Sequence, residues 1–280
     1  MLWIFAARGA ILEKTRGGCP VERKPICVDA QDFPAALRPL LRQGVYDSSC
    51  SPAARVYFLE AEGGCYLKRA KQGSLKKEAE LTEYFHGRGL AARVLAYESL
   101  EEDWLLTARL PGEDCAAPAY LAQPNKLSAL LGEVLRQLHE LDPAGCPPSP
   151  RMADYAAIAG AAKAPESCDL KSYAGICAYP SREAAWEKVQ RCAGLLQRDT
   201  LLHGDYCLPN VLLDRWQLSG FVDLDGAGVG DRHVDLFWGI WSLAYNLKTG
   251  AYTRRFLDAY GRDAVEEEML RTVAALEVFG

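Results

Sequence analysis

The chain of 280 residues lacks the spacings that mark several common kinds of site. Its ten cysteines are scattered singly, and the absence of any Cys-x-x-Cys pair argues against a zinc finger or a thioredoxin-like redox motif. No G-x-x-x-x-G-K segment occurs, so a Walker-type phosphate loop is excluded. We expect the cysteines to be reduced and mostly buried, as in a cytosolic protein.

The sequence also lacks an excess of basic over acidic residues and lacks long apolar runs. The formal charge of −5 argues against nucleic acid as a main partner and is compatible with a cationic ligand. No stretch approaches the ~18 uncharged residues of a membrane-spanning helix, and the opening "MLWIFAARGA" meets Arg8 too early for a secretory signal. We expect a soluble cytoplasmic protein without membrane contact, in which residues 1–28 form an extension of unknown role.

What is present favours two differently built parts. With 49% apolar residues the chain can bury a sizeable core. Residues 55–70, "RVYFLEAEGGCYLKRA", predict two strands joined tightly at Gly63-Gly64, with Lys68 near the end of the second strand. Residues 74–89 predict a helix that ends at glycine, and residues 93–114 predict another strand pair.

The pattern becomes helical after Pro111-Gly112. Residues 125–143, "NKLSALLGEVLRQLHELDP", space leucines as an amphipathic helix that Pro143 stops. We therefore expect an α+β protein with a β-rich lobe at 29–110 and a mainly helical lobe at 111–280.

The stretch "LLHGDYCLPNVLLD" at 201–214 places polar residues between two apolar runs that predict strands. Asp205 and Asn210 lie in this turn, and Asp223 ends the strand that returns in the following hairpin. Asp and Asn oxygens suit a hard cation such as Mg²⁺, and a separate Asp can orient a hydroxyl and accept its proton. Taken singly, each residue is also explained by the preference of Asp and Asn for turns.

The segment "HGDYCLPNVLLD…LSGFVDLDGAGVGDRHVDL" resembles the catalytic segment of the aminoglycoside phosphotransferases, the 3′-type kinases in particular. The resemblance implies a bilobal protein-kinase-like fold and transfer of the γ-phosphoryl group of ATP, or of GTP, to a hydroxyl. It implies that Asp205 is catalytic and that Asn210 and Asp223 hold Mg²⁺.

The same resemblance assigns the nucleotide-binding residues. It implies that Lys68 holds the α- and β-phosphates and that Glu78 of the next helix fixes Lys68. Ser51 falls in the turn that covers the β-phosphate. Backbone groups from Ala108 to Leu110 fall in the hinge that contacts the purine.

The resemblance to the acceptor site is partial. Glu277 matches a tail glutamate of the family, and Gly280 would supply the terminal carboxylate. Asp225 stands in "DLDGAG", where the family usually has Gly-Arg, and Tyr245-Asn246 replaces an acidic pair. We expect Asp225, Asn246, Glu277 and Gly280 to face a hydroxylated and cationic acceptor in a monomer or dimer.

By analogy, His203 and Asp235 hold the loop and perform no chemistry. The other histidines, His86, His139 and His233, need no functional explanation, and Trp238 is expected in a helix core. Three functions stay open: an aminoglycoside 3′-phosphotransferase, a kinase of the same fold for another small alcohol, and a nucleotide-binding module that no longer catalyses.

Overall fold

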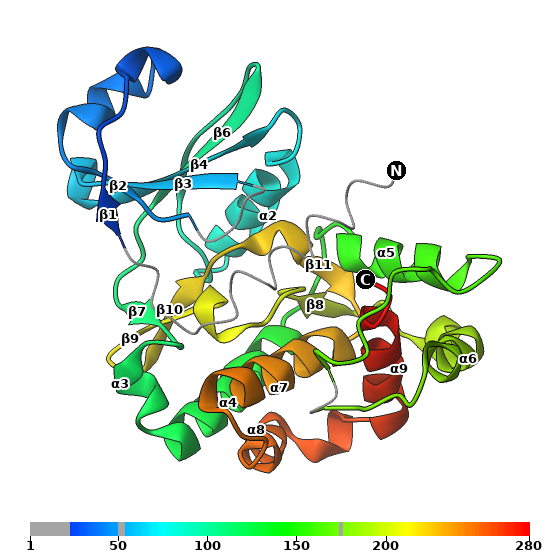
Figure 1. Cartoon of the computed structure of the whole chain (residues 1–280). Helices are drawn as coiled ribbons and strands as arrows, with labels where there is room; N and C mark the ends of the chain where they lie inside the picture. Colours follow the sequence, from blue (N-terminus) through cyan, green and yellow to red (C-terminus); the bar gives the residue numbers. More distant parts are fainter. Residues whose placement is uncertain (1–22, 50–53, 174–175) are drawn as a thin grey trace. The chain divides into compact units, whose positions relative to one another are not determined.

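The chain folds into two compact units (Figure 1). The computed structural model describes residues 23–49, 54–173 and 176–280. The first unit contains the described residues up to Glu113 and adds Leu212–Val222, and the second contains Asp114–Val211 and Asp223–Gly280. The division differs from the expected organisation in two respects. Most of the hairpin after the Asp205 loop groups with the first unit, and residues 24–28, expected in a separate extension, pair with and pack on the sheet of that unit.

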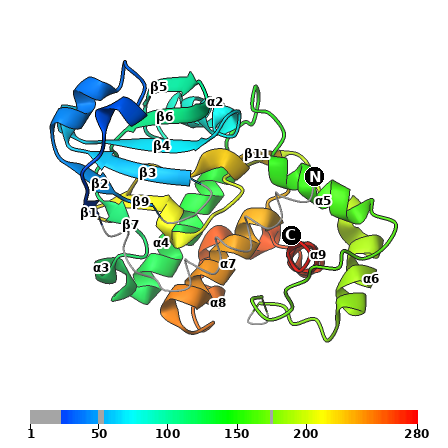
Figure 2. The same ribbon diagram turned by 45° about the horizontal axis from the view of Figure 1, so that its top comes forward.

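The first unit is built on a six-stranded antiparallel sheet in the order β1-β2-β3-β4-β6-β5. Its strands are β1 (Lys24–Pro25), β2 (Val45–Asp47), β3 (Ala54–Leu59), β4 (Cys65–Lys71), β5 (Val94–Ser99) and β6 (Glu102–Ala108). Helix α2 (Lys76–His86) covers one face, where Leu75 and Ala79 pack on Leu105. Phe33 and Leu37, from the segment with the short helices η1 (Ala30–Asp32) and η2 (Arg38–Arg42), pack on the other face. Figure 2 shows the backbone of this segment, in blue, beside the sheet.

The connection between β3 and β4 differs from the expected tight turn at Gly63-Gly64. Leu59 pairs with Cys65, so five residues form the turn, including η3 (Ala61–Gly63). Positive φ values at Glu62, Gly63 and Gly64 close this longer loop. The side chain of Glu60 accepts hydrogen bonds from Gly44 N and Tyr46 Oη, which ties the loop to the neighbouring β2 region. Lys68 consequently lies in the middle of β4 and not near its end.

The expected helix at 74–89 and the strand pair at 93–114 are confirmed by α2, β5 and β6. The hairpin after the Asp205 loop is also confirmed, as β9 (Val211–Asp214) and β10 (Gln217–Phe221). Asp223 does not end the returning strand as expected, because β10 stops at Phe221 and Asp223 adopts a left-handed conformation just before η6. These strands belong to a sheet in the order β10-β9-β7, with β7 at Glu113–Asp114. The strand before the loop, β8 (Thr200–Leu202), pairs instead with β11 (Gly228–Gly230), so the loop connects two different sheets.

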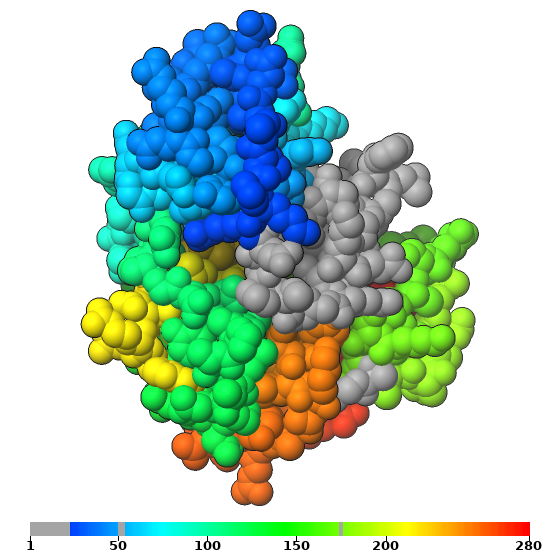
Figure 3. All heavy atoms as spheres, turned by 60° about the vertical axis from the view of Figure 1, so that its left-hand side comes forward, coloured from blue at the N-terminus to red at the C-terminus, as the bar shows by residue number. Residues whose placement is uncertain are grey.

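The second unit is mainly helical. Its helices are α3 (Pro118–Leu121), α4 (Pro124–His139), α5 (Pro150–Ala159), α6 (Arg182–Cys192), α7 (His233–Leu247), α8 (Thr253–Tyr260) and α9 (Glu267–Glu277), with the short turns η4 (Ala193–Leu195), η5 (Leu208–Asn210), η6 (Leu224–Gly226) and η7 (Arg262–Ala264). Helix α4 confirms the amphipathic helix expected before Pro143, and it packs closely on α8. In Figure 3 the green surface that includes this helix lies beside orange surface from the later part of the same unit. Gly132 permits this approach, because a Cβ there would lie 2.3 Å from Phe256 O.

The described residues can be checked for membrane-spanning helices and for the state of the cysteines. No helix in these ranges is long and apolar enough to cross a membrane. All eight cysteines in these ranges are free thiols, and three of them are buried: Cys65, Cys115 and Cys192. The expectation that most cysteines are buried is wrong for these eight, because five of them are at least partly exposed.

Candidate active site

The carboxylate of Asp205 is held on both oxygens by its own loop. The thiol of Cys207 donates to Asp205 Oδ1 at 3.1 Å, and the amide Nδ2 of Asn210 donates to Asp205 Oδ2 at 3.1 Å. Asn210 Nδ2 also donates to the backbone oxygen of Asp205 at 3.0 Å. Burial and the neighbouring Asp205 raise the pKa of the Cys207 thiol, which therefore remains a protonated donor. The loop thus presents a carboxylate of fixed orientation.

The backbone before Asp205 requires glycine. Gly204 has φ +83°, and a Cβ at this position would lie 1.9 Å from the carbonyl oxygen of Gly226. The segment that follows Asp223 therefore runs in direct contact with the loop that carries Asp205. The antiparallel pairing of β11 with β8, in which Gly228 is opposite Leu202, continues this contact.

Asp235 on α7 anchors the loop from behind, as expected. Its Oδ2 accepts from His203 N at 2.7 Å, and its Oδ1 accepts from Gly204 N at 2.7 Å. The side chain is fully buried, where hydrogen bonds to a carboxylate are strong and costly to lose. Asp235 therefore fixes the loop and leaves the chemistry to other groups.

His139 supports the same anchor, which sequence reasoning did not foresee. Its Nε2 lies 3.1 Å from Asp235 Oδ2, and its Nδ1 lies 2.8 Å from Tyr260 Oη. A carboxylate only accepts, so Nε2 carries the proton and Nδ1 accepts from the Tyr260 hydroxyl. Burial lowers the pKa of His139, while Asp235 acts in the opposite direction.

This histidine predicts a dependence of stability on pH. Because the pKa of His139 is lowered from 6.5 in the folded chain, the unfolded chain binds more protons just below pH 6.5. Acidification through that window should lower the free energy of unfolding by up to about 1.4 kcal/mol per pH unit. Urea unfolding of wild type and His139→Gln between about pH 5 and pH 7.5 measures the effect. A difference between the two proteins that stays constant with pH would contradict the assignment.

Asn210 and Asp223 offer hard oxygen ligands. The donation of Asn210 Nδ2 to Asp205 directs the other amide atom, the oxygen Oδ1, away from that carboxylate. Asp223 is exposed and has φ 60° and ψ 57°, a left-handed conformation that is unusual for a non-glycine residue. No cluster of three or more His, Cys, Asp or Glu side chains suited to a metal occurs among the described residues. Two oxygen ligands fit Mg²⁺, which completes its shell with water and phosphate oxygens.

In the first unit, the expected pair of Lys68 and Glu78 is present. Lys68 Nζ lies 3.0 Å from Glu78 Oε1 and 2.8 Å from Oε2, and the Glu78 side chain is almost fully buried. The ammonium group, held by both carboxylate oxygens, is fixed on β4 facing α2. Its binding of phosphate stays a prediction.

The structure says less about the other residues that are expected to bind the nucleotide, Ser51, Ala108 and Leu110. Ser51 lies outside the described residues. The amide of Ala108 donates to Arg93 O at 2.9 Å, so this N–H is already used and is not a donor for a purine. The expected contact of Leu110 stays a prediction.

The four residues expected at the acceptor differ in their surroundings. Asp225 and Gly280 are exposed. The amide of Asn246 donates to Ser242 O at 2.8 Å and to Ser242 Oγ at 3.3 Å, within α7. Glu277 is buried, and its Oε1 accepts from other side chains of the unit. Acceptor binding by these residues stays a prediction.

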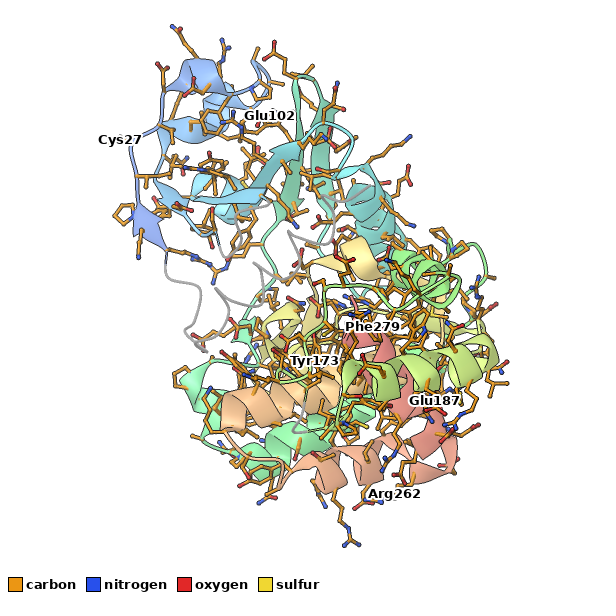
Figure 4. All side chains as sticks on the ribbon, turned by 45° about the vertical axis from the view of Figure 1, so that its right-hand side comes forward. Cys27, Glu102, Tyr173, Glu187, Arg262 and Phe279 are labelled. Carbon is orange, nitrogen blue, oxygen red and sulfur yellow. The ribbon has the colours of Figure 1, made fainter. Side chains whose placement is uncertain are left out.

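The tail that follows Glu277 is tied to the segment preceding α6. Asp169 N donates to Val278 O at 2.8 Å. Figure 4 labels Phe279 at the end of α9 and Tyr173 on that preceding segment. The chain end is therefore part of the folded second unit.

Sequence reasoning missed the donors that surround Glu277. Oε1 accepts from Arg151 Nη1 at 3.0 Å, from Tyr155 Oη at 2.5 Å and from Trp238 Nε1 at 3.2 Å. Trp238 is in the helix core as expected, but it also donates this hydrogen bond. Arg151 and Tyr155, four residues apart, share one face of a helix, and this spacing was the available signal.

Comparison with known proteins agrees with this geometry. The model of the "Phosphotransferase enzyme family" matches residues 53–273. A "Probable aminoglycoside 3'-phosphotransferase" of Lactococcus lactis is 41% identical over 259 residues, covering 92% of this chain and 98% of the relative. An "Aminoglycoside 3'-phosphotransferase" of Niallia circulans is 29% identical over 74% of this chain and 79% of its own length.

The fold is also found among solved structures. An aminoglycoside 3′-phosphotransferase of type VIII has a TM-score of 0.64 at 26% identity, covering 98% of this chain and 99% of its own. The fold is therefore the bilobal α+β, protein-kinase-like one. The chain is an enzyme and belongs to the phosphotransferase enzyme family.

Proposed function

We propose that this enzyme is an aminoglycoside 3′-phosphotransferase that moves the γ-phosphoryl group of ATP, or of GTP, to a sugar hydroxyl in the cytoplasm. The observation that carries the proposal is the Asp205 carboxylate, held on both oxygens by Cys207 and Asn210. This loop lies in a chain that is 41% identical to a probable 3′-phosphotransferase over nearly that relative's whole length.

In the proposed reaction, the acceptor oxygen forms a bond to the γ-phosphorus, and the bond from that phosphorus to the β–γ bridging oxygen breaks. The diphosphate leaves with the electron pair of the broken bond. Asp205 orients the acceptor hydroxyl and takes its proton as the new bond forms. Fixed carboxylate orientation matters because phosphoryl transfer is accelerated mainly by alignment and charge stabilisation.

Each unit contributes other groups to the proposal. In the first unit, Lys68 is held by Glu78 with its ammonium group able to bind phosphate oxygens. In the second unit, Asn210 and Asp223 would hold Mg²⁺. When bound, this ion neutralises charge on the phosphate oxygens.

A second candidate keeps the chemistry and changes the acceptor to another small alcohol. The charge of Glu277 is already compensated by the buried guanidinium of Arg151, which lies 3.0 Å away. An ammonium group of an acceptor therefore gains less from this carboxylate than from an uncompensated one. Tyr245 and Asn246 also provide no negative charge in α7.

A panel assay tests both candidates. Release of nucleoside diphosphate by the purified enzyme is measured with ATP and with GTP in the presence of Mg²⁺. The acceptors are kanamycin, a matched 3′-deoxy aminoglycoside and uncharged sugars. We expect turnover with kanamycin and none with the 3′-deoxy compound. The same enzyme, expressed in a susceptible host, should raise the inhibitory concentration of kanamycin but not of the 3′-deoxy compound.

Other outcomes separate the alternatives. Turnover of both aminoglycosides would retain the drug class and refute the 3′ position. Turnover with an uncharged sugar alone would favour the second candidate. Nucleotide binding without turnover of any acceptor would contradict both and favour a non-catalytic nucleotide-binding module.

A further inference from the structure

Arg151 on α5 is a buried cation that connects the catalytic loop to the C-terminal helix. Its Nε donates to Gly204 O at 2.6 Å, and its Nη1 donates to Glu277 Oε1 at 3.0 Å. Its guanidinium carbon lies 5.0 Å from the centre of the Trp238 ring. A single side chain thus contacts three elements, which are the loop that leads to Asp205, helix α7 and helix α9.

The environment of this guanidinium is strongly anionic. Burial acts to lower the pKa of Arg151, but Glu277 first, and then Tyr155, Asp205 and Asp225, stabilise its charged form and raise the pKa above the usual value of arginine. A buried charge persists only where partners satisfy it, and here the principal partner is Glu277. Glu277 is itself held by Tyr155 and Trp238, so the position of the guanidinium is determined on several sides.

The bond to Gly204 O acts on the peptide unit that leads into Asp205. The carbonyl of Gly204 and the amide of Asp205 belong to one planar unit, so holding the oxygen fixes the rotation of that plane. The Asp205 amide donates to His203 Nδ1 at 3.3 Å, and the Gly204 amide donates to Asp235. Arg151 is the charged group that holds the oxygen side of this plane.

We propose that Arg151 is a positioning residue for phosphoryl transfer, which sets the orientation of the Asp205 carboxylate through Gly204 and is itself held by Glu277 of the C-terminal helix. The role of α9 is then to hold this guanidinium as well as to pack the unit. The proposal rests on the proposed function, because turnover is one of its two readouts. The second readout, exchange of the loop amides, does not depend on any acceptor.

The first variant, Arg151→Lys, keeps the buried charge beside Glu277 but cannot make both bonds, because an ammonium group lacks the guanidinium fork. We expect kcat to fall roughly 10- to 100-fold while KM for ATP changes by less than about 3-fold. In hydrogen exchange followed by mass spectrometry, the peptide that contains residues 203–211 should exchange faster than in wild type.

A double variant separates positioning from stability. In Arg151→Met with Glu277→Gln both charges of the buried ion pair are removed, and the glutamine oxygen can still accept from Tyr155 and Trp238. We expect the melting temperature to exceed that of Arg151→Met alone, while kcat stays as low as in Arg151→Lys. Recovery of both stability and kcat in the double variant would overturn the proposal, because packing alone would then explain Arg151.

A matched control disrupts another ion pair of α9. Lys188 on α6 lies 2.5 Å from Glu268 on α9, and neither side chain hydrogen-bonds to residues 203–211 in the part of the chain that the structure describes. Lys188→Met should lower the melting temperature and leave kcat and the exchange of residues 203–211 near wild type. Equal loss of kcat in Lys188→Met and Arg151→Lys would also overturn the proposal. If wild type turns over no acceptor, the proposed function fails, and loop exchange alone decides the role of Arg151.

Discussion

Asp205→Ala is expected to lower kcat by about 10³-fold while binding of ATP stays within a few-fold of wild type. The carboxylate is proposed to orient the acceptor hydroxyl and to take its proton. In the described residues, the side-chain donors Cys207 Sγ and Asn210 Nδ2 bind no carboxylate other than that of Asp205, so no second carboxylate can take its place. Single-turnover assays with kanamycin measure the chemical step, and calorimetric titration measures nucleotide affinity.

Asp205→Asn serves as the matched variant because it keeps the size of the side chain. Its amide retains one oxygen that can accept from Cys207 or Asn210, but it cannot take a proton from the acceptor. A similar loss of kcat in both variants points to the carboxylate charge and basicity, and near-complete activity in Asp205→Asn would leave only a steric role. Turnover of Asp205→Ala at the wild-type rate would remove Asp205 from the mechanism.

Local patterns predicted much of the fold and the centre of the site. Helices α2 and α4 follow from apolar spacing that ends at glycine or near proline. The Asp205 loop follows from polar residues between two apolar strands, and the bonds of Asn210 to Asp205 join residues only five positions apart. The pairing of Lys68 with Glu78, ten positions apart on a strand and the next helix, was instead predicted from the family resemblance and not from the local pattern.

Predictions failed where the deciding partner is distant in sequence. The β3 to β4 turn is longer than expected because Glu60 bonds Tyr46 and Gly44, and neither partner is apparent from the glycine pair. Arg151 and Glu277 are 126 positions apart, and His139 and Asp235 are 96 apart. Periodicity within a helix tells which of its faces is buried, but not which charged side chain from another helix is buried against it.

The second large effect is expected for Asp223→Asn, with kcat/KM for ATP lowered about 10²- to 10³-fold. The loss of one anionic oxygen ligand weakens binding of Mg²⁺ and of the phosphates it neutralises, and several kcal/mol of stabilisation depend on that charge. Asparagine also tolerates the left-handed backbone that Asp223 adopts, at φ 60°, so the substitution removes charge without new strain. Steady-state rates over a Mg²⁺ titration measure the effect.

The form of that titration distinguishes a metal ligand from a structural aspartate. If Asp223 binds the ion, a higher Mg²⁺ concentration should recover part of the lost rate, because weaker binding is offset by mass action. Asp214→Asn is the control, since Asp214 ends β9 of the hairpin that precedes Asp223 and, in the described residues, forms an ion pair only with the exposed Arg215. It should keep the wild-type rate and Mg²⁺ dependence. If the Asp223→Asn enzyme keeps the wild-type rate at limiting Mg²⁺, Asp223 is not a ligand of the ion. Its left-handed conformation then has only a structural role, and other oxygen atoms bind Mg²⁺.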